Sequence, residues 1–220
     1  MTVRTLMQAG ALALAAAAVG PATHAAPAPA LFQAPALVQD RVLARAVANL
    51  QVTAPNLGAD NLLPLSATGY GREVSFPVSW TPVPGAKSYA LVFEELDPQQ
   101  PRAQVFWIAY NIPAEVTSLG HSIHSKAEFQ GPQGFMQGQN SFGGIGYMAP
   151  KPPVGDAPHH YHLEVFALSR TLPIKGGERI DKLVSEMNNR VIAEGELVVS
   201  YQAPRPVDNG PGGAPPSRRP

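Results

Sequence analysis

Short apolar runs separated by Gly, Pro and Asn dominate the chain after residue 50, and this pattern favours β-strands over helices. The clearest strand pattern covers residues 88–94, and residues 103–111 form a continuous apolar run of strand length. Such a run is typical of a strand that is covered on both faces. Residues 161–168 alternate with a period of two, and Phe166 adds apolar character to their second face. The pattern therefore predicts a mainly β fold with several buried strands.

Weaker signals predict further elements around these strands. Residues 50–54 form a candidate first strand and residues 193–201 a final one. Residues 74–80 alternate around Pro77, which cannot donate a backbone hydrogen bond and so predicts an edge or a bend. Apolar residues recur at helical spacing in residues 36–50 and 179–189, which predicts a short helix at each place.

The segment at residues 147–158 is expected to form a shaped loop, because its four prolines fix φ and remove amide donors. Gly155 and Asp156 supply turn chemistry within it. A stiff loop that leads into a buried strand loses little entropy on binding, which suits a small anion or a polar head group. A rigid connector without a ligand fits the same pattern. Residues 118–144 lack a period and are expected to form a long surface excursion.

The N-terminus has the layout of a secretory signal peptide over residues 1–25, with Arg4, an apolar run and a small-residue cleavage site near Ala25. We therefore expect an exported protein, periplasmic or secreted. An alanine- and proline-rich linker that includes the first predicted helix follows at residues 26–49. The folded domain is expected at residues 50–203, and the tail at residues 204–220 is rich in proline and glycine and should be disordered.

Composition excludes some classes of function. The 220 residues contain no cysteine, and 16 basic residues balance 16 acidic ones. Loss of residues 1–25 removes Arg4 and no acidic residue, so the mature chain has a formal charge of minus one. This balance is not that of a nucleic-acid-binding protein. After the leader, no stretch is long and apolar enough for a transmembrane span, and roughly 150 ordered residues suffice for one core.

Several short segments carry specific motifs. They are Ser-Phe-Pro-Val-Ser-Trp at residues 75–80, Pro-Gly-Ala-Lys-Ser-Tyr-Ala-Leu at 84–91, Trp-Ile-Ala-Tyr-Asn-Ile-Pro at 107–113, Tyr-Met-Ala-Pro-Lys-Pro-Pro at 147–153, Pro-His-His-Tyr at 158–161 and Ala-Glu-Gly-Glu-Leu at 193–197. In this order they resemble the phosphatidylethanolamine-binding protein (PEBP) family, in the bacterial YbhB/YbcL-like branch that is similar to Raf kinase inhibitor proteins. The resemblance covers most of residues 50–202.

The resemblance implies a PEBP-like antiparallel β-sandwich with a few peripheral helices and a small anion pocket at one end. It implies a protein that holds a phosphate or zwitterionic head group, such as that of a phospholipid, without turnover and without a cofactor. It gives no catalytic residue and no metal ligand. The ligand-binding residues that it implies are Glu95, Asp97, Phe106, Trp107, Tyr147, Ala149, Pro150, Pro153, His159 and Tyr161.

Three of these positions depart from the family pattern, since Glu95 stands where the family has the shorter aspartate, Phe106 where it has a histidine and Ala149 where it has a glycine. His159 and Tyr161 can donate hydrogen bonds from one face of a strand, while Phe106 or Trp107 supplies an apolar wall. Carboxylates at Glu95 and Asp97 repel a phosphate unless they hold a histidine protonated, accept from a ligand amine or are themselves protonated. That chemistry favours an ethanolamine-like zwitterion.

Other interpretations stay open. His159 and Tyr161 could only brace the proline loop through buried hydrogen bonds. A protein-interaction module that inhibits a partner fits the family's regulatory members and the long segment at residues 118–144. A hydrolase or lyase would use His159 as general base, although Ser79 and Ser141 lack the framing of a nucleophile.

Two patterns carry little weight. Histidines at positions 121, 124, 159, 160 and 162 lack partners at metal-ligand spacing and are expected to be solvated. Gly143, Gly144 and Gly146 lack the strand and helix that frame a phosphate-binding loop, which argues against a nucleotide site.

Overall fold

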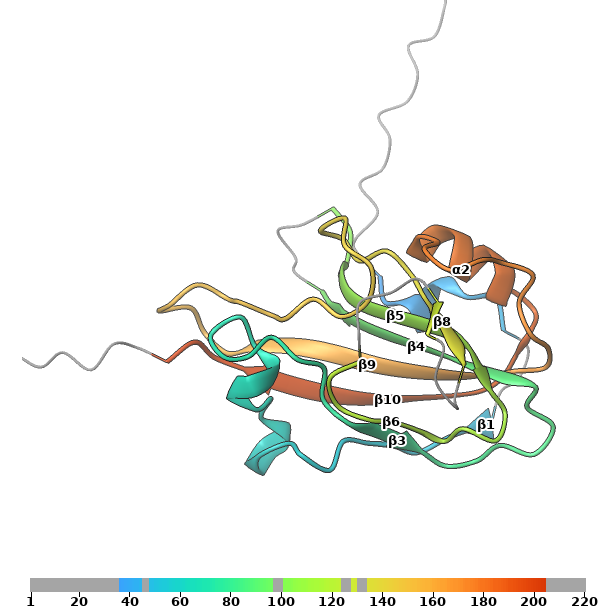
Figure 1. Cartoon of the computed structure of the whole chain (residues 1–220), viewed down its shortest axis with the longest axis horizontal. Coiled ribbons are helices and arrows are strands. Elements are labelled where there is room, and N and C mark those ends of the chain that lie inside the picture. Colours follow the sequence, from blue (N-terminus) through green and yellow to red (C-terminus); the bar gives the residue numbers. More distant parts are fainter. Residues whose placement is uncertain (1–35, 45–47, 97–100, 124–127, 130–133, 205–220) are drawn as a thin grey trace, which may run out of the picture. The chain divides into compact units, whose positions relative to one another are not determined.

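Strands dominate the structure, a computed structural model that describes residues 36–44, 48–96, 101–123, 128–129 and 134–204 (Figure 1). The predicted signal peptide, the alanine- and proline-rich segment before residue 36 and the tail after residue 204 lie outside the described residues. The elements are α1 (Val38–Arg41), β1 (Ala48–Asn49), β2 (Val52–Thr53), the 3₁₀ turns η1 (Ala59–Asn61) and η2 (Leu65–Ala67), β3 (Val78–Trp80), β4 (Ser88–Glu95), β5 (Gln104–Pro113), β6 (Ser118–Leu119), β7 (Glu128–Phe129), β8 (Phe135–Gln137), β9 (His159–Leu168), α2 (Ile180–Met187) and β10 (Val191–Tyr201).

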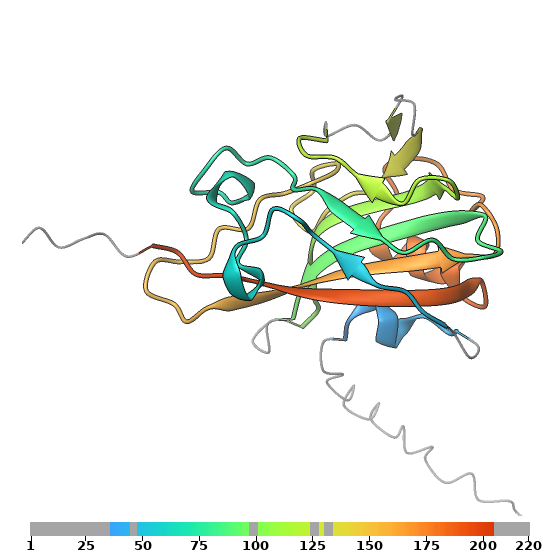
Figure 2. The same cartoon turned by 90° about the horizontal axis from the view of Figure 1, so that it is seen from below.

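The described strands form two sheets. The larger has seven strands in the order β1-β10-β9-β4-β5-β8-β7, and the smaller has three in the order β2-β3-β6. The long strands pair antiparallel, and β1 joins the edge of β10 in parallel. In Figure 2, cyan β2 and teal β3 lie against one face of the larger sheet. The mainly β sandwich predicted from the sequence is confirmed.

The core between the sheets is aromatic. Phe93 of β4 and Trp107 of β5 are fully buried there, and Tyr161 of β9 is 1% exposed. They pack with residues of the smaller sheet, including Val78 and Trp80. Where the alternation of side chains along a strand is regular, the neighbours of these residues, such as Val92 and Ile108, point to the other face of the larger sheet.

That second face is also covered, by α1 and α2. Apolar residues of the long strands pack against Val38 and Val42, in and just after α1, and against Leu183 and Met187 of α2. The larger sheet is therefore buried on both faces, which explains the continuous apolar run in β5 and the complete burial of β4. The predicted strands at residues 88–94, 103–111, 161–168 and 193–201 and the helix at residues 179–189 are confirmed.

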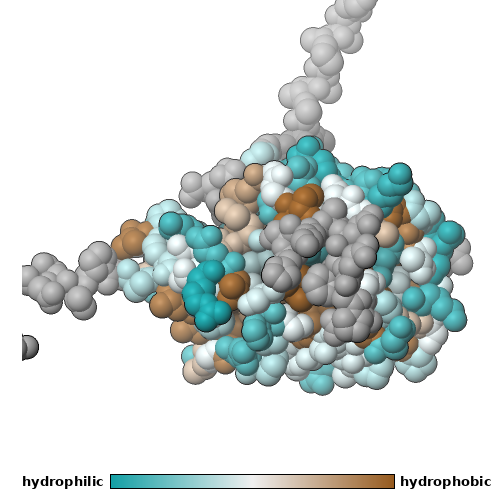
Figure 3. Space-filling view, viewed as in Figure 1, coloured by the Kyte–Doolittle hydropathy of each residue, from teal (hydrophilic) through white to brown (hydrophobic). Residues whose placement is uncertain are grey.

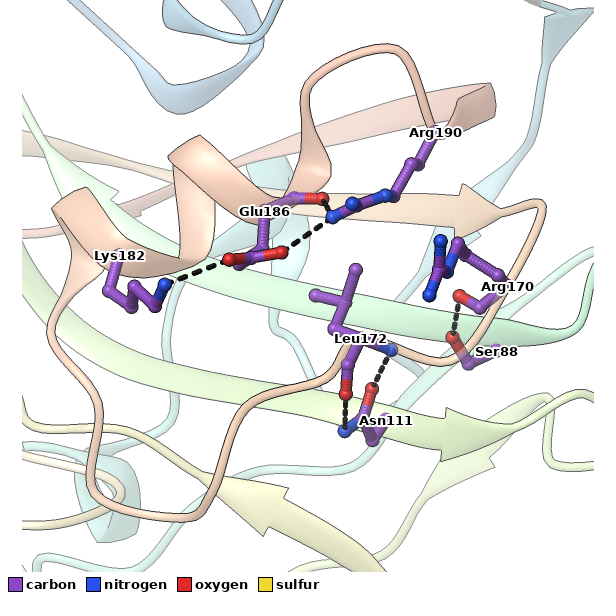
Figure 4. A network of polar contacts seen from close by, with 7 residues as sticks. All are labelled: Ser88, Asn111, Arg170, Leu172, Lys182, Glu186 and Arg190. Atoms are coloured by element: carbon purple, nitrogen blue, oxygen red, sulfur yellow. Dashed lines mark hydrogen bonds and ion pairs between the residues drawn. The ribbon is translucent and has the colours of Figure 1, made fainter.

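Polar contacts fix the connection between β9 and α2 (Figure 4). The Asn111 side-chain amide donates to the Leu172 carbonyl at 3.0 Å and its oxygen accepts from the Leu172 amide at 2.8 Å. The Ser88 hydroxyl donates to the Arg170 carbonyl at 3.0 Å. On α2 and just after it, Glu186 pairs with Lys182 at 2.8 Å and with Arg190 at 2.7 Å. The Ser88 and Asn111 contacts therefore tie the connection to β4 and β5, whereas the Glu186 pairs lie within α2 and the turn after it.

Two carboxyl groups are buried beneath α1. Glu94 and Glu164 are both fully buried on the covered outer face of the sheet. The Val38 amide donates to Glu94 Oε1 at 2.6 Å, and the Gln39 amide donates to Glu164 Oε1 at 3.1 Å. The segment at residues 38–42 is therefore attached to the sheet by hydrogen bonds to two buried carboxyl groups as well as by its apolar side chains.

Three sequence predictions were wrong in part. The helix predicted at residues 36–50 is a single turn, α1, because Leu50 instead donates to the Glu194 carbonyl beside β10. The strand predicted at 74–80 starts only after Pro77, and it lies in the centre of the smaller sheet. The surface excursion at 118–144 contains β6, β7 and β8 and buries Leu119 and Phe135. Strands of two or three residues are too short to show a period.

The surface offers little sign of a large apolar interface on the face seen in Figure 3. On the part of that face not covered by grey residues, hydrophobic side chains occur in small separate groups among hydrophilic ones. Scattered groups of this kind are normal for a folded domain.

Candidate functional site

The ends of β4 and β9 bring together the residues of the candidate site. In the antiparallel register Glu95, the last residue of β4, lies opposite Tyr161 of β9. His159 precedes Tyr161 by two positions and therefore points to the same face. This end of the sheet adjoins the proline loop, so the strand carries the polar groups and the loop closes over them.

A cavity of about 300 Å³ lies at this place. Six of the ten predicted residues line it, namely Glu95, Phe106, Ala149, Pro153, His159 and Tyr161. The remaining lining residues were not predicted from the sequence and are Gln104, Phe142, Met148, Lys151, Pro152 and Asp156. The size is at the lower end of the range of ligand pockets, which suits a small head group.

His159 is held by two carboxylates. Its Nδ1 lies 2.5 Å from Glu95 Oε1 and its Nε2 lies 3.4 Å from Asp156 Oδ2. Burial lowers the pKa of His159, but the hydrogen bond and charge of Glu95, with a smaller contribution from Asp156, outweigh burial and leave that pKa raised above its ordinary value. The side chains of His159 and Glu95 are 27% and 10% exposed, so solvent reaches the imidazole from the pocket. A protonated imidazole at this position can face an anion.

Tyr161 forms the floor of the pocket. Burial, followed by the charge of Glu95 and the nearby Tyr201, raises the pKa of Tyr161 above its ordinary value, so the hydroxyl stays protonated. Its ring stacks on His159 with centroids 6.4 Å apart. It also meets Phe106 edge to face at 5.4 Å. The hydroxyl and the imidazole thus lie beside an apolar wall.

A bulge in β5 turns Phe106 into the pocket. Phe93 pairs with Trp107 and Glu94 pairs with Val105, so Phe106 is the extra residue in the ladder. As a result Phe106 and Trp107 both lie on the inner face, although consecutive strand residues normally point to opposite faces. Phe106 supplies the pocket wall, whereas Trp107 is fully buried in the core and donates from Nε1 to Gln137 Oε1 at 2.9 Å.

Tyr147 and Pro150 support the loop and do not line the cavity. The Tyr147 hydroxyl donates to the Ala67 carbonyl at 2.5 Å, and the Pro150 carbonyl accepts from the Gly69 amide at 2.9 Å. The Tyr70 hydroxyl donates to the Pro152 carbonyl at 2.6 Å. The proline loop is therefore fastened to residues 67–70 along its length, as the two loops at the left of Figure 1 show. Asp97, the remaining predicted residue, lies outside the described residues.

Phe142 lines the pocket, although no pattern in the sequence predicts a role for it. It comes from the segment without a period, and its ring lies 5.5 Å from that of Phe106. Asn140 fixes the turn, because its Oδ1 accepts from the amides of Phe142 at 3.0 Å and Gly144 at 3.1 Å. Phe142 is 54% exposed, so this rigid turn presents an aromatic ring at the mouth of the pocket. Met148, Lys151 and Pro152 belong to the proline loop that the sequence did identify.

The charges of the pocket are mixed. Glu95 and Asp156 are acidic, His159 is held towards its protonated form, and Lys151 also lines the cavity, with its ammonium 5.6 Å from the centre of the Tyr70 ring. Both signs of charge thus meet a ligand within one small space. The arrangement can receive an anion at the imidazole and a cation at a carboxylate.

Among the residues that the structure describes, the serine and histidine side chains considered as alternatives do not line this pocket. Ser141 accepts from the Val105 amide through its hydroxyl at 2.8 Å, and it is not among the described lining residues. His162 pairs with Glu196, and His121 Nδ1 lies 3.0 Å from the Ser122 hydroxyl. Within the described residues, no group of three or more His, Cys, Asp or Glu side chains is arranged to hold a metal ion. The helices of the described part are also all too short or too polar to cross a membrane.

Sequence comparisons point to one family. A family model described as phosphatidylethanolamine-binding protein matches residues 53–202. A UPF0098 protein of Pyrococcus abyssi is 35% identical over 147 residues, which cover 66% of this chain and 81% of that protein. The UPF0098 protein YbcL of Escherichia coli is 32% identical over 140 residues, which cover 61% of this chain and 76% of that protein.

Two crystal structures are similar in fold. That of E. coli YbcL, described as a new member of the mammalian PEBP family, matches with a TM-score of 0.64 at 30% identity and covers 71% of this chain and 100% of its own. That of CT736, a PEBP homologue from Chlamydia trachomatis, matches with a TM-score of 0.62 at 27% identity and covers 71% and 99%.

Proposed function

Because the chain belongs to the phosphatidylethanolamine-binding protein family, in the branch that includes YbcL, we propose that its pocket holds a small phosphorylated or zwitterionic head group without converting it. The observation that carries this proposal is the His159–Glu95 pair at the wall of the 300 Å³ cavity. Glu95 favours the charged form of the imidazole, and its Nε2, whose contact with the half-exposed Asp156 is long at 3.4 Å, is the nitrogen that can donate to a phosphate oxygen instead.

The remaining pocket groups complement such a head group. Tyr161 offers a second donor next to His159, because its hydroxyl keeps its proton. Asp156 is half exposed at the same histidine and can accept from a ligand ammonium. Phe106 excludes water on one side, and it also takes the place where the family resemblance expects another histidine donor. The balance of charges favours a zwitterion over inorganic phosphate.

Binding without turnover is part of the proposal. Catalysis of ester cleavage needs a placed nucleophile or an activated water beside the base. Ser141 uses its hydroxyl to accept a backbone hydrogen bond, which supports a structural role for that serine. His159 points one nitrogen at Glu95 and the other at Asp156, an arrangement suited to holding a charge. We expect no product when the protein is incubated with phosphoesters and carboxylic esters.

Titration calorimetry with phosphoethanolamine tests the proposal. The wild type should give a saturable heat, and His159→Ala should weaken binding by about 1.5–3 kcal/mol, the usual contribution of a charged hydrogen bond. His160→Ala is the matched control, because His160 is the adjacent residue, is exposed and does not line the cavity. Equal affinities for all three proteins, or no heat from the wild type, would contradict the proposal.

A protein-interaction or inhibitor module is the second candidate, and one observation favours it. Phe142 and Met148 are 54% and 40% exposed at the mouth of the pocket, and the Asn140 turn holds Phe142 in place. Fixed exposed apolar side chains are typical of contact surfaces. Absence of ligand heat together with a partner whose capture is lost in Phe142→Ala would select this candidate.

Export is also proposed, from the predicted leader at residues 1–25. Expression of the full chain in a Gram-negative host, followed by cell fractionation and mass spectrometry of the purified protein, tests it. A periplasmic or secreted product that begins after Ala25 is the expected result, whereas a cytoplasmic product that retains the leader would rule export out.

A further inference from the structure

A second, larger cavity lies beside residues 64–77. Its volume is about 470 Å³, within the range of small-ligand pockets. It shares no lining residue with the pocket described above. The same stretch of chain nevertheless borders both, because Ala67, Gly69 and Tyr70 hydrogen-bond the proline loop while Ser66 and Arg72 line the second cavity.

The charge of this cavity is of one sign. Arg72 and His121 are the basic residues that line it, and no acidic side chain occurs among its described lining residues. Within the described part of the chain, no carboxylate lies within ion-pair distance of Arg72. The known pairs involve other basic side chains, namely Arg41, Arg102, His159, His162, Lys182 and Arg190. The guanidinium is therefore available to a ligand, in contrast to the paired His159 of the first pocket.

The walls are rigid and partly apolar. Pro55, Pro64 and Pro77 line the cavity and fix φ at three places. Gly71 closes the turn so tightly that a Cβ there would lie 1.9 Å from the Leu65 carbonyl oxygen. The Val74 amide then donates to the Ser66 carbonyl at 3.1 Å. Because these walls are already ordered, the surrounding chain loses little conformational entropy when a ligand enters the cavity.

Polar groups in the cavity complement Arg72. Ser66, Ser75 and Asn56 add hydroxyl and amide groups to the lining, while Leu57 and Phe76 supply apolar surface. A planar guanidinium binds a carboxylate or a phosphate through two parallel hydrogen bonds. We propose that this second cavity binds a small organic anion that carries a carboxylate or phosphate group on an apolar body.

The experiment follows backbone amide shifts of the ¹⁵N-labelled mature protein during titration with benzoate and, separately, with phenyl phosphate. Saturable shifts at the amides of Ser66, Arg72 and Val74 are expected for at least one probe. Arg72→Ala should weaken that binding about tenfold or more, the effect of losing one charge-assisted contact. Comparison of the two probes distinguishes a carboxylate from a phosphate ligand, and benzyl alcohol, which has no charge, should cause no saturable shift.

Two control variants make the result specific. Arg170→Ala removes another exposed arginine, away from the cavity lining, and should leave the affinity unchanged. His159→Ala removes the charged donor of the first pocket and should also leave it unchanged. The proposal is overturned if neither probe shifts the lining amides, if Arg72→Ala binds as the wild type does, or if binding disappears in His159→Ala. Failure of phosphoethanolamine binding would not affect it, because the two cavities share no lining residue.

Discussion

His159 and Glu95 form a 2.5 Å hydrogen bond between neighbouring antiparallel strands, at the point where β4 ends and β9 begins. Glu95 is the more buried partner, with a side chain that is 10% exposed. The carboxylate therefore acts on the imidazole with little screening by solvent, whereas Asp156 on the same ring is half exposed and lies 3.4 Å away. The strand register places a charge next to a histidine, and the histidine faces the pocket.

The first prediction concerns the protonation of His159. Its pKa in the folded protein should lie above the 6.5 of an unperturbed imidazole, because Glu95 stabilises the charged form. Glu95→Gln should lower that pKa, and Asp156→Asn should lower it by less. The stabilisation that His159 contributes is complete below the unfolded pKa and is lost as the pH rises through the raised folded value. A titration of the imidazole followed by NMR measures the change, and an identical His159 pKa in wild type and Glu95→Gln would contradict it.

The second prediction concerns Phe106. The bulge in β5 directs this side chain into the pocket beside Tyr161, where the family resemblance expects a histidine. Phe106→His should tighten binding of inorganic phosphate by about 1.5–3 kcal/mol, because it adds a charge-assisted hydrogen bond. Phe106→Leu is the control, since it changes the shape of the wall without adding a donor. Equal phosphate affinities for Phe106→His and Phe106→Leu in calorimetry would contradict the idea that a histidine at position 106 donates to a bound phosphate.

The third prediction tests the core beneath the pocket. Trp107 is fully buried, and Trp107→Ala should reduce the free energy of unfolding by about 3–5 kcal/mol, because the stiff sheet cannot fill the resulting cavity. Phe142→Ala removes another large aromatic side chain, but one that is 54% exposed, so it should cost much less. Urea denaturation followed by circular dichroism measures both. A change of less than about half a kcal/mol in Trp107→Ala would place the tryptophan outside the core.

The sequence predicted the elements whose signals are local. Strands of eight or more residues, such as β4, β5 and β9, show their apolar pattern over their whole length, and α2 shows helical spacing. The family motifs located Glu95, Phe106, His159 and Tyr161, which the structure brings together in one cavity. These residues lie on or next to long strands, so their positions follow once the register is set.

Features that depend on distant contacts were not predictable. Phe142 lines the pocket because the Asn140 turn brings a segment without any period against β5. Phe106 and Trp107 would face opposite ways in a regular strand, and only the bulge in the pairing with β4 puts both on the inner face. No propensity of the residues concerned encodes that bulge. The second cavity depends on a tight turn at Gly71, which is equally invisible in the hydrophobic pattern.

The last prediction concerns Glu94 and Glu164, the carboxyl groups beneath α1. Burial is the main cause that raises the pKa of each, and the charge of Glu94 adds to the effect on Glu164. Both groups thus bind protons in the folded state over a pH range in which the unfolded chain has released them. The stabilisation that these two groups contribute should therefore be complete below the ordinary value of 4.5 and be lost as the pH rises through the raised values, by at most about 1.4 kcal/mol per pH unit for each extra proton held.

Glu164→Gln should flatten this dependence, because a neutral amide keeps an acceptor for the Gln39 amide and has no proton to lose. Glu115→Gln is the control, since Glu115 is exposed and away from α1. Urea melts from about pH 6 to about pH 10 give the free energies of unfolding. Equal slopes for the wild type and Glu164→Gln would show that the buried pair does not hold the extra proton. A flatter slope would show that Glu164 holds the extra proton, as expected because charging both groups leaves two like charges in an interior that solvent does not screen.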